Sequence, residues 1–326
     1  MINIAVIGCG HISRKMTNTL RLMKQNGEAV HLYAAAAREL SRAQAFAQAE
    51  GFEKAYGSYE EMLRDGNVDL VYIGTPHSHH FEQILLCLNH GKHVLCEKAF
   101  TLNAAQARKA ISLAREKGLL LAEAIWPRYM PSRELITGLI AEIGGAQYIA
   151  SDLHYEMESI PRIIQPELAG GALLDIGVYA LTFALMYMTA PIQRVETCAQ
   201  LTPAGVDRQD SITLFAQDGC VAQLSCGIAA QAGQHTLIAG PQGSLSVDNV
   251  FNPRVVTVTT GDGVRQVAMP PQLTGYEYEI RACMEAIKHG WTECPAMPHS
   301  EIIRVMEWMD HCRARWGMVY PQEAQA

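Results

Sequence analysis

The 326-residue sequence lacks the cysteine pattern of a disulfide framework or a structural zinc site. Its nine cysteines are scattered, their number is odd, and none forms a C-x-x-C pair. Such usage is typical of reduced, buried thiols, so we expect a cytoplasmic protein. Cys9 and Cys96 lie beside motifs described below, and we interpret both as small packing residues.

An excess of basic charge is also absent. The chain has 26 lysines and arginines against 33 aspartates and glutamates, its formal net charge is -7, and it contains no basic run. These features argue against binding to a phosphate backbone, so we expect no nucleic-acid partner. The first segment, MINIAVIG, has no basic region before its apolar residues, which favours a strand over a signal peptide.

No apolar run is long enough to predict a membrane span. The most apolar stretch, residues 172–190, carries Asp175 near its start, and the uninterrupted part is shorter than the ~20 residues that a span needs. We therefore predict a buried helix and no membrane partner. The composition, with 49% hydrophobic and 18% charged residues, is that of an ordered globular protein long enough for two domains.

The chain divides into two parts that differ in the pattern of their predicted helices and strands. In residues 1–123, apolar runs alternate with helical patterns, which predicts an α/β domain with a doubly wound parallel sheet, a Rossmann domain. In residues 124–326, two predicted helices, near 131–142 and 172–189, precede a series of strands joined by short turns. Two further helices, near 275–289 and 299–316, close the chain. This order predicts a C-terminal α+β domain with a large open, mainly antiparallel sheet.

The segment GCGHIS follows the first predicted strand and opens the first predicted helix. Gly8 permits a tight turn, and Gly10 allows the backbone to approach a pyrophosphate at the helix N-terminus, beside His11 and Ile12. The third glycine of the usual fingerprint is Ser13 here, so we expect slightly looser packing of this helix. In this context the motif predicts a dinucleotide-binding loop.

The end of the second predicted strand bears on which dinucleotide is bound. A carboxylate there would hold the ribose 2′-hydroxyl of NAD, but the sequence has Ala37 followed by Arg38, with Arg42 one helical turn later. Guanidinium groups can grip a 2′-phosphate with two hydrogen bonds each. The alternative is that both arginines are solvated surface residues, and Glu39 is a signal against NADP. We predict NADP in preference to NAD.

Further candidate residues follow the later parallel strands. Ligands of open parallel sheets lie beyond the carboxyl ends of the strands, so these residues converge on the nicotinamide end of a bound dinucleotide. We assign the following to cofactor binding: Thr75, Pro76, His77, His80, Glu97, Lys98, Trp126 and Arg128. The histidines of the H-x-H-H cluster lack further ligands at a telling spacing, so we predict no metal site.

The second domain contributes Asp175 and Tyr179, which are four residues apart and project from one face of the buried helix. One account places Asp175 in a structural network with a backbone group or an arginine. The other gives this face a catalytic role, because burying a lone carboxylate is costly. His154 and Arg162 are candidate substrate contacts, although Arg162 is equally well explained as a structural ion-pair partner.

The motifs GCGHIS, AAAR, TPHSHH, GKHVLCEKA, EAIWPRY and GGALLDIGVY occur in this order. With them the chain resembles the glucose–fructose oxidoreductase/inositol dehydrogenase (Gfo/Idh/MocA) family from end to end, especially its dimeric dihydrodiol dehydrogenase and NADP-dependent D-xylose dehydrogenase branch. The resemblance implies a Rossmann domain, a second domain whose sheet forms a dimer interface, and an active site with Lys98, Asp175 and Tyr179. It also favours the catalytic account of the Asp175 face.

The implied reaction moves a hydride between nicotinamide and a cyclic alcohol, such as an aldopyranose, a polyol or a trans-dihydrodiol. Lys98 would lower the pKa of Tyr179 or stabilise an alkoxide, and either residue could transfer the proton. A cofactor-binding sensor without turnover, or a redox-neutral sugar-processing enzyme that retains its nicotinamide, are the alternatives. Where the family usually has Glu-Lys-Pro, this chain has Ala99, so we predict a trans Lys98–Ala99 bond.

Overall fold

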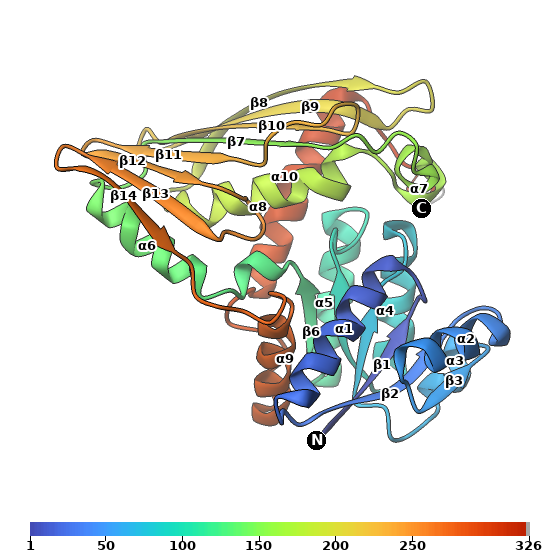
Figure 1. The fold of residues 1–326 in the computed structure, drawn as a ribbon. Helices are drawn as coiled ribbons and strands as arrows, with labels where there is room; N and C mark the ends of the chain where they lie inside the picture. The colour runs from blue at the N-terminus through green and yellow to red at the C-terminus, as the bar shows by residue number, and fades with distance from the viewer. Residues whose placement is uncertain (324–326) are drawn as a thin grey trace. The chain divides into compact units, whose positions relative to one another are not determined.

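The computed structural model describes residues 1–323, and the chain divides into two compact units (Figure 1). The first unit comprises Met1–Tyr129 and Gln272–Ile303. The second comprises Met130–Pro271 and the described residues from Arg304 to Glu323. The boundary expected after residue 123 lies slightly before this division, and no sequence pattern indicated that the chain returns to the first unit at Gln272.

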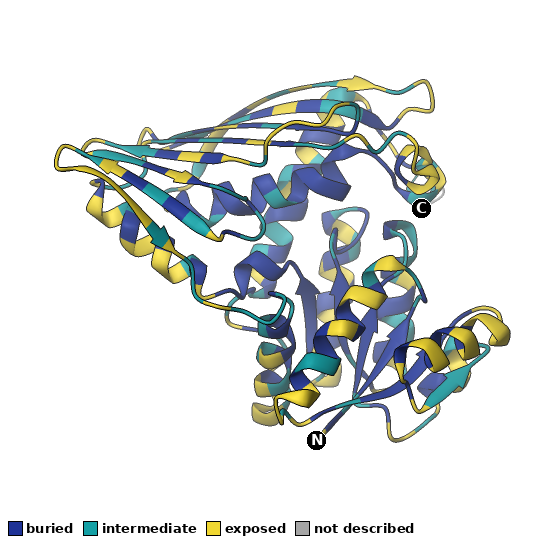
Figure 2. Cartoon of the chain, viewed as in Figure 1, coloured by how far each residue is buried: buried dark blue, intermediate teal, exposed yellow. Residues whose placement is uncertain are grey.

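The first unit contains a six-stranded parallel sheet with the order β3-β2-β1-β4-β5-β6. This order is that of a doubly wound sheet, which confirms the predicted Rossmann fold. The strands are dark blue in Figure 2 because nearly all their residues, apart from those of the edge strand β3, are buried. The strands are β1 (Ile2–Ile7), β2 (Val30–Ala36), β3 (Lys54–Tyr56), β4 (Leu70–Ile73), β5 (His93–Glu97) and β6 (Leu121–Ala124).

Two helices of this unit, α3 and α5, begin at a residue whose side chain caps them. Asn103 caps α5, since its side chain accepts a hydrogen bond from the Gln106 amide at 2.9 Å, and Gly118 ends the helix with a φ of 64°. The helices are α1 (His11–Gln25), α2 (Leu40–Glu50), α3 (Tyr59–Leu63), α4 (His80–Asn89), α5 (Ala104–Lys117) and α9 (Glu277–His289), with 3₁₀ turns η1 (His77–His79) and η2 (Trp126–Arg128).

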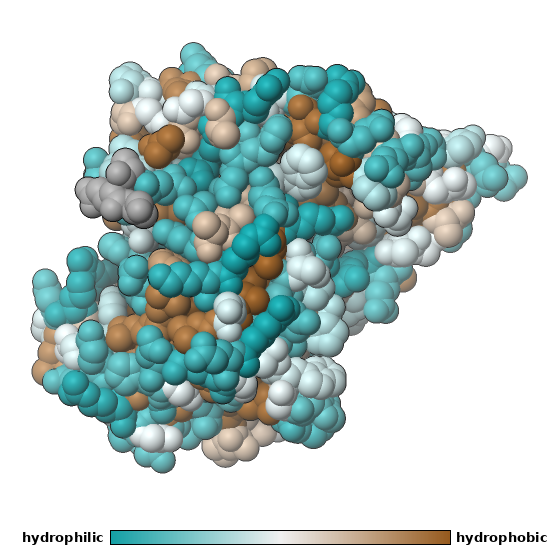
Figure 3. All heavy atoms as spheres, turned by 180° about the vertical axis from the view of Figure 1, so that it is seen from behind, coloured by the Kyte–Doolittle hydropathy of each residue, from teal (hydrophilic) through white to brown (hydrophobic). Residues whose placement is uncertain are grey.

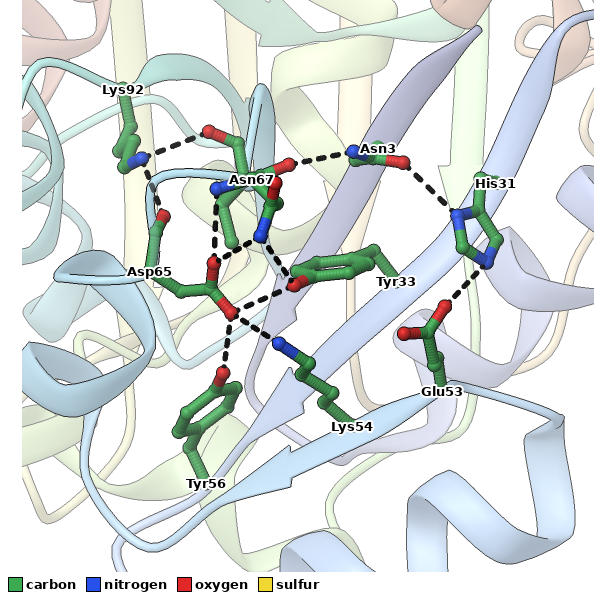
Figure 4. A network of polar contacts seen from close by, with 10 residues as sticks. Asn3, His31, Tyr33, Glu53, Lys54, Tyr56, Asp65, Asn67 and Lys92 are labelled. Carbon is green, nitrogen blue, oxygen red and sulfur yellow. Dashed lines mark hydrogen bonds and ion pairs between the residues drawn. The ribbon is translucent and has the colours of Figure 1, made fainter.

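A polar network around Asp65 joins β2, β3 and the loop before β4 (Figure 4). Asp65 Oδ2 accepts hydrogen bonds from Tyr33 Oη, Lys54 Nζ and Tyr56 Oη at 2.7–2.8 Å, while its Oδ1 accepts from the Asn67 amide at 2.9 Å. The bond from Lys54 lowers the pKa of Asp65 most. The network fixes the edge of the sheet next to the end of β2, where Arg38 lies.

The second unit contains an eight-stranded sheet with the order β14-β13-β12-β11-β7-β10-β9-β8. Neighbouring strands are antiparallel except β7 and β10, which are parallel, so the predicted open, mainly antiparallel sheet is confirmed. The strands are β7 (Tyr148–His154), β8 (Ile192–Leu201), β9 (Asp207–Ala216), β10 (Val221–Gly227), β11 (Thr236–Gly240), β12 (Gly243–Val247), β13 (Val255–Thr260) and β14 (Gly263–Ala268).

The apolar helix predicted at 172–190 is the core of this unit. It begins as a π-helical turn, η4 (Leu173–Gly177), and continues as α8 (Val178–Tyr187), which packs on β7 and β10. The longer segment Pro166–Tyr187 is long and apolar enough to cross a membrane, but 89% of its most apolar window is buried within the protein. The other helical elements are α6 (Ser132–Glu142), α7 (Pro161–Ile164), η3 (Pro166–Leu168) and α10 (His299–Trp316).

Large apolar side chains at the surface are dispersed. The most exposed include Val264 on the edge strand β14, at 69%, and Val319 near the end of the chain, at 65%. On the face drawn in Figure 3, hydrophobic residues are interspersed with hydrophilic ones. The apolar residues of the two sheets therefore serve mainly to build the interior of each unit.

Candidate active site

The loop between β1 and α1 has the form of a phosphate cradle. Gly8 has a φ of 94°, and a Cβ added there would lie 2.8 Å from the Gly74 carbonyl oxygen, so only glycine fits. Gly10 is the N-cap of α1 and provides no side-chain cap for the first helical amides. A Cβ added at Gly10 would meet only the Gly74 carbonyl oxygen, at 3.9 Å, and the free helical amides fit a dinucleotide pyrophosphate.

Ser13 does not loosen the packing of α1, so that expectation is wrong. Ser13 is fully buried, and its Oγ donates a hydrogen bond to the Gly8 carbonyl at 2.5 Å. A Cβ added at Gly74 would lie 2.5 Å from Ser13 Oγ. The glycine that permits close helix–strand approach is therefore supplied by the end of β4 instead of by α1.

Arg38 and Arg42 are exposed beside this loop. Burial raises the pKa of the Cys9 thiol, and the charges of Arg42 and Arg14 oppose that shift, which places Arg42 near the loop. Arg38 acts in the same way on Tyr59 and lowers the pKa of His79 in addition to the effect of burial. The two guanidinium groups therefore create a positive potential at the end of β2 that suits a 2′-phosphate.

The segment after β4 brings Thr75, Pro76 and His77 to the carboxyl edge of the sheet, as predicted from topology. Thr75 Oγ1 donates to Gln83 Oε1 at 2.7 Å. His80 is fully buried, and its two ring nitrogens lie 2.9 Å from the carbonyl oxygens of Thr75 and Ala99. Burial lowers the pKa of His80 to about 4, and both carbonyl contacts oppose that shift, because a neutral imidazole could donate to only one of the two oxygens. The ring bridges the end of β4 and that of β5.

Lys98 follows the last residue of β5 and is half-buried. The Lys98–Ala99 bond is cis, so the predicted trans bond is wrong. That prediction rested on the replacement of proline alone and ignored the surroundings. Ala99 and Phe100 are fully buried, and the Ala99 carbonyl contacts His80 Nδ1.

Glu97 is 5% exposed, and its Oε1 accepts a hydrogen bond from Tyr72 Oη at 2.5 Å. The carboxylate is therefore anchored within the sheet, next to Lys98. Its predicted contact with the cofactor stays a prediction.

Two buried acids near Glu97 were not predicted from the sequence. Glu123 on β6 is 2% exposed and Glu279 on α9 is fully buried, and the charge of Glu97 acts on both. Burial raises the pKa of Glu123 to about 8 and that of Glu279 well above its usual range. The sequence did contain a signal for a buried acid at Glu123, because it is the one charged residue in the predicted strand LLLAEA.

Trp126 and Arg128 lie in η2, just beyond β6, and both are buried. The Trp126 ring stacks on Tyr276 with 4.3 Å between the ring centroids. Arg128 donates to the Ala296 carbonyl and to Glu301 Oε2, both at 3.1 Å. These contacts stabilise the return of the chain into the first unit, and the predicted cofactor contacts of both residues stay predictions.

In the second unit, Asp175 lies in the π-helical turn and Tyr179 in the first turn of α8. Asp175 is 5% exposed, and its Oδ1 accepts a hydrogen bond from Arg162 Nη1 at 2.8 Å. Asp175 is therefore paired with an arginine, Arg162 of α7, as expected if Asp175 belongs to a structural network. The Tyr179 ring lies 5.3 Å from that of Phe251, measured between centroids.

His154 ends β7, and its Nε2 lies 2.8 Å from Ser225 Oγ on the parallel neighbour β10. Gly227 leaves room for the imidazole, since a Cβ added there would lie 2.5 Å from His154 Nδ1. Whether His154 contacts substrate stays a prediction. Among residues 1–323, no group of three or more histidines, cysteines or acids is arranged to hold a metal ion.

Comparison with known proteins agrees with this architecture. Residues 2–124 match the Gfo/Idh/MocA oxidoreductase family with an NAD-binding Rossmann fold, and residues 140–246 match the Gfo/Idh/MocA C-terminal domain. The trans-1,2-dihydrobenzene-1,2-diol dehydrogenases of Danio rerio and Homo sapiens are 34% and 32% identical to this chain. Each alignment covers 98% of both proteins.

The solved structures include a 3-ketoreductase from Actinomadura kijaniata in complex with NADP and TDP-benzene. It superposes with a TM-score of 0.87 and 28% identity over 96% of this chain and 97% of that chain. UDP-N-acetylglucosamine 3-dehydrogenase from Acidithiobacillus ferrooxidans shares the fold, with a TM-score of 0.81, 20% identity and 97% coverage of both chains. The chain therefore belongs to the Gfo/Idh/MocA family and is an oxidoreductase with an NAD(P)-binding Rossmann fold.

Proposed function

We propose that this protein is an NADP-dependent dehydrogenase that oxidises a CH–OH group of a cyclic alcohol or reduces the corresponding ketone. The candidate substrates are a trans-dihydrodiol, a polyol and an aldopyranose such as D-xylose. The observation that carries the proposal is the relation to the trans-dihydrobenzenediol dehydrogenases over the whole chain, at 34% identity. The 3-ketoreductase among the similar structures supports chemistry between a ketone and a hydroxyl group.

The nicotinamide of the bound cofactor would accept or donate the hydride at its C4 atom. Lys98, held at the end of β5, stabilises negative charge on the reacting oxygen. Tyr179 exchanges the hydroxyl proton with the substrate. Asp175, oriented by Arg162, binds neighbouring substrate hydroxyls.

NADP is proposed in preference to NAD because Arg38 and Arg42 flank the phosphate loop and no carboxylate ends β2. A 2′-phosphate would be held by charge-assisted hydrogen bonds from these guanidinium groups. The A. kijaniata structure, which contains NADP, is consistent with this choice.

We further propose that the protein is cytoplasmic and forms a homodimer through the eight-stranded sheet. Sedimentation of the purified protein would test the dimer.

The test is formation of NADPH, followed at its absorbance band, with trans-dihydrodiols, inositols and aldopyranoses as separate substrates. We expect turnover with at least one class and a lower KM for NADP than for NAD. Binding of NADP without turnover of any substrate would favour a sensor. Product formation without accumulation of NADPH would favour a redox-neutral enzyme that retains its nicotinamide.

A further inference from the structure

Two buried aspartates lie beneath the helix that carries Asp175. Asp207 is fully buried and Asp210 is 3% exposed, and both belong to β9. Residues three apart normally point to opposite faces of a strand. Here Leu201 of β8 pairs with Asp207 and Gln200 pairs with Gln209, so Arg208 is an extra residue. This bulge turns both carboxyl groups toward the interior.

Asp207 holds the start of the π-helical turn. Its Oδ2 accepts a hydrogen bond from the Leu173 amide at 2.5 Å. Gly171, with a φ of 111°, leaves space for the carboxyl group, since a Cβ added there would overlap Asp207 Oδ1. From the other side, Tyr320 Oη donates to the Gly170 carbonyl at 2.7 Å. Hydrogen bonds to two buried side chains, Asp207 and Tyr320, thus hold the segment that leads into Asp175.

The remaining oxygens of the aspartates have no donor other than each other. Within residues 1–323, Asp207 Oδ1 and both oxygens of Asp210 find no hydrogen-bond donor, and each carboxyl group acts on the pKa of the other. The cation that acts on Asp207 is Arg313 of α10, which donates to Asp310 and to both oxygens of Glu323. Two acceptors can bond only if one carries a proton.

The other titratable groups that face the pair are Cys226 of β10, Cys312 of α10 and Tyr320. Thiols and phenols supply no positive charge in any protonation state, and burial raises the pKa of each of these three groups, which disfavours their anions. Burial also raises the pKa of both aspartates, and the charge of Asp207 raises that of Asp210 further. The surroundings therefore favour retention of one proton by the pair near neutral pH.

We propose that Asp207 and Asp210 are positioning residues that share one proton, and that this proton keeps Asp207 on the Leu173 amide and so fixes the turn that carries Asp175. Loss of the proton would leave two buried negative charges side by side, which is strongly unfavourable. The pair would separate and the turn would loosen. The consequence for turnover rests on the proposed function, whereas the structural role does not.

Three variants test the proposal. Asp210→Asn supplies a permanent N–H donor to Asp207, Asp210→Ala removes the donor, and Asp262→Asn in the exposed β13–β14 turn is the control. Hydrogen exchange of the segment 170–179 is measured between pH 5 and 9 and corrected for intrinsic rates. We expect protection to fall with rising pH in the unmodified protein and in Asp262→Asn, but to stay level in Asp210→Asn. In Asp210→Ala, exchange at the Leu173 amide should be roughly tenfold faster throughout.

If protection in Asp210→Asn falls with pH as much as in the unmodified protein, the proposal that the two aspartates share a proton is wrong. Normal protection of Leu173 in Asp210→Ala would overturn the positioning role. If Asp210→Ala fails to fold, the pH series of Asp210→Asn decides. These measurements need no substrate, so they remain decisive if no dehydrogenase activity is found. Where turnover is detected, Asp210→Ala should raise the KM for the alcohol and leave NADP affinity unchanged.

Discussion

At the scale of single residues, Lys98 and Tyr179 carry the chemistry in the proposed function. Lys98→Met and Tyr179→Phe remove the ammonium and the hydroxyl with little change in shape. We expect each to lower kcat by about 10²–10⁴-fold, because such groups contribute that much to proton transfer and charge stabilisation. Steady-state kinetics measures the loss, and NADP titration shows whether binding survives. Full turnover in both variants would refute the assigned roles, and Lys117→Met on the surface of α5 serves as the control.

Arg38 is the residue on which the choice of cofactor depends. Arg38→Ala should raise the KM for NADP by roughly 10–100-fold and leave the KM for NAD nearly unchanged, since a charge-assisted hydrogen bond contributes about 1.5–3 kcal/mol. The ratio of kcat/KM for the two cofactors provides the measurement. Equal effects on both cofactors would mean that Arg38 does not contact a 2′-phosphate. Arg64→Ala, an exposed arginine of the same unit, controls for net charge.

At the scale of elements, the Asp65 network anchors the edge of the parallel sheet (Figure 4). Asp65→Asn should destabilise the protein by about 1–3 kcal/mol at pH 7, because the buried Tyr33 and the half-buried Lys54 and Tyr56 lose a charged acceptor. The folded-state pKa of Asp65 is lowered, so its contribution is present above the unfolded pKa of about 3.9 and is lost as pH falls below it. Urea unfolding should therefore show a smaller difference between variant and parent at pH 3 than at pH 7. A difference that does not change with pH would contradict this account.

Elements with a strong periodic pattern could be predicted from the sequence, while those that depend on packing could not. The helix predicted near 131–142 is α6 (Ser132–Glu142), and the one predicted near 299–316 is α10. In contrast, the π-helical turn at Leu173–Gly177 lies within an apolar run whose composition fits either helix type. The three-residue strand β3 is too short to produce a detectable alternation.

At the scale of the whole molecule, buried acids make stability depend on pH. Burial raises the pKa of Glu123 to about 8, so its contribution is fully present below the unfolded pKa of about 4.3 and is lost as pH rises toward 8. Glu123→Gln keeps the shape without the titration. Its free energy of unfolding should fall less between pH 5 and pH 8 than that of the parent, by about one to a few kcal/mol. Denaturant titrations check this, with the exposed Glu116→Gln as control; parallel curves for Glu123→Gln and the parent would exclude the effect.

The candidate site was predictable where topology alone determines position. Gly8, Thr75 and Lys98 follow strands whose carboxyl ends share one edge of a parallel sheet, so their placement in the first unit needed no tertiary information. Glu279 and Asp210 could not be found in this way. Their burial depends on how α9 packs and on a bulge in β9, and neither feature has a signature in single-sequence periodicity.

The return of Gln272–Ile303 to the first unit has a consequence for dissecting the protein. The chain crosses between the units after Tyr129, Pro271 and Ile303, so the second unit is largely an insertion within the first. A gene fragment that stops at Tyr129 would omit the Thr292 carbonyl that pairs with the Leu121 amide, and the Tyr276 ring that covers Trp126. A nucleotide-binding fragment that folds by itself would therefore need both parts of the first unit, Met1–Tyr129 and Gln272–Ile303, connected by a short linker.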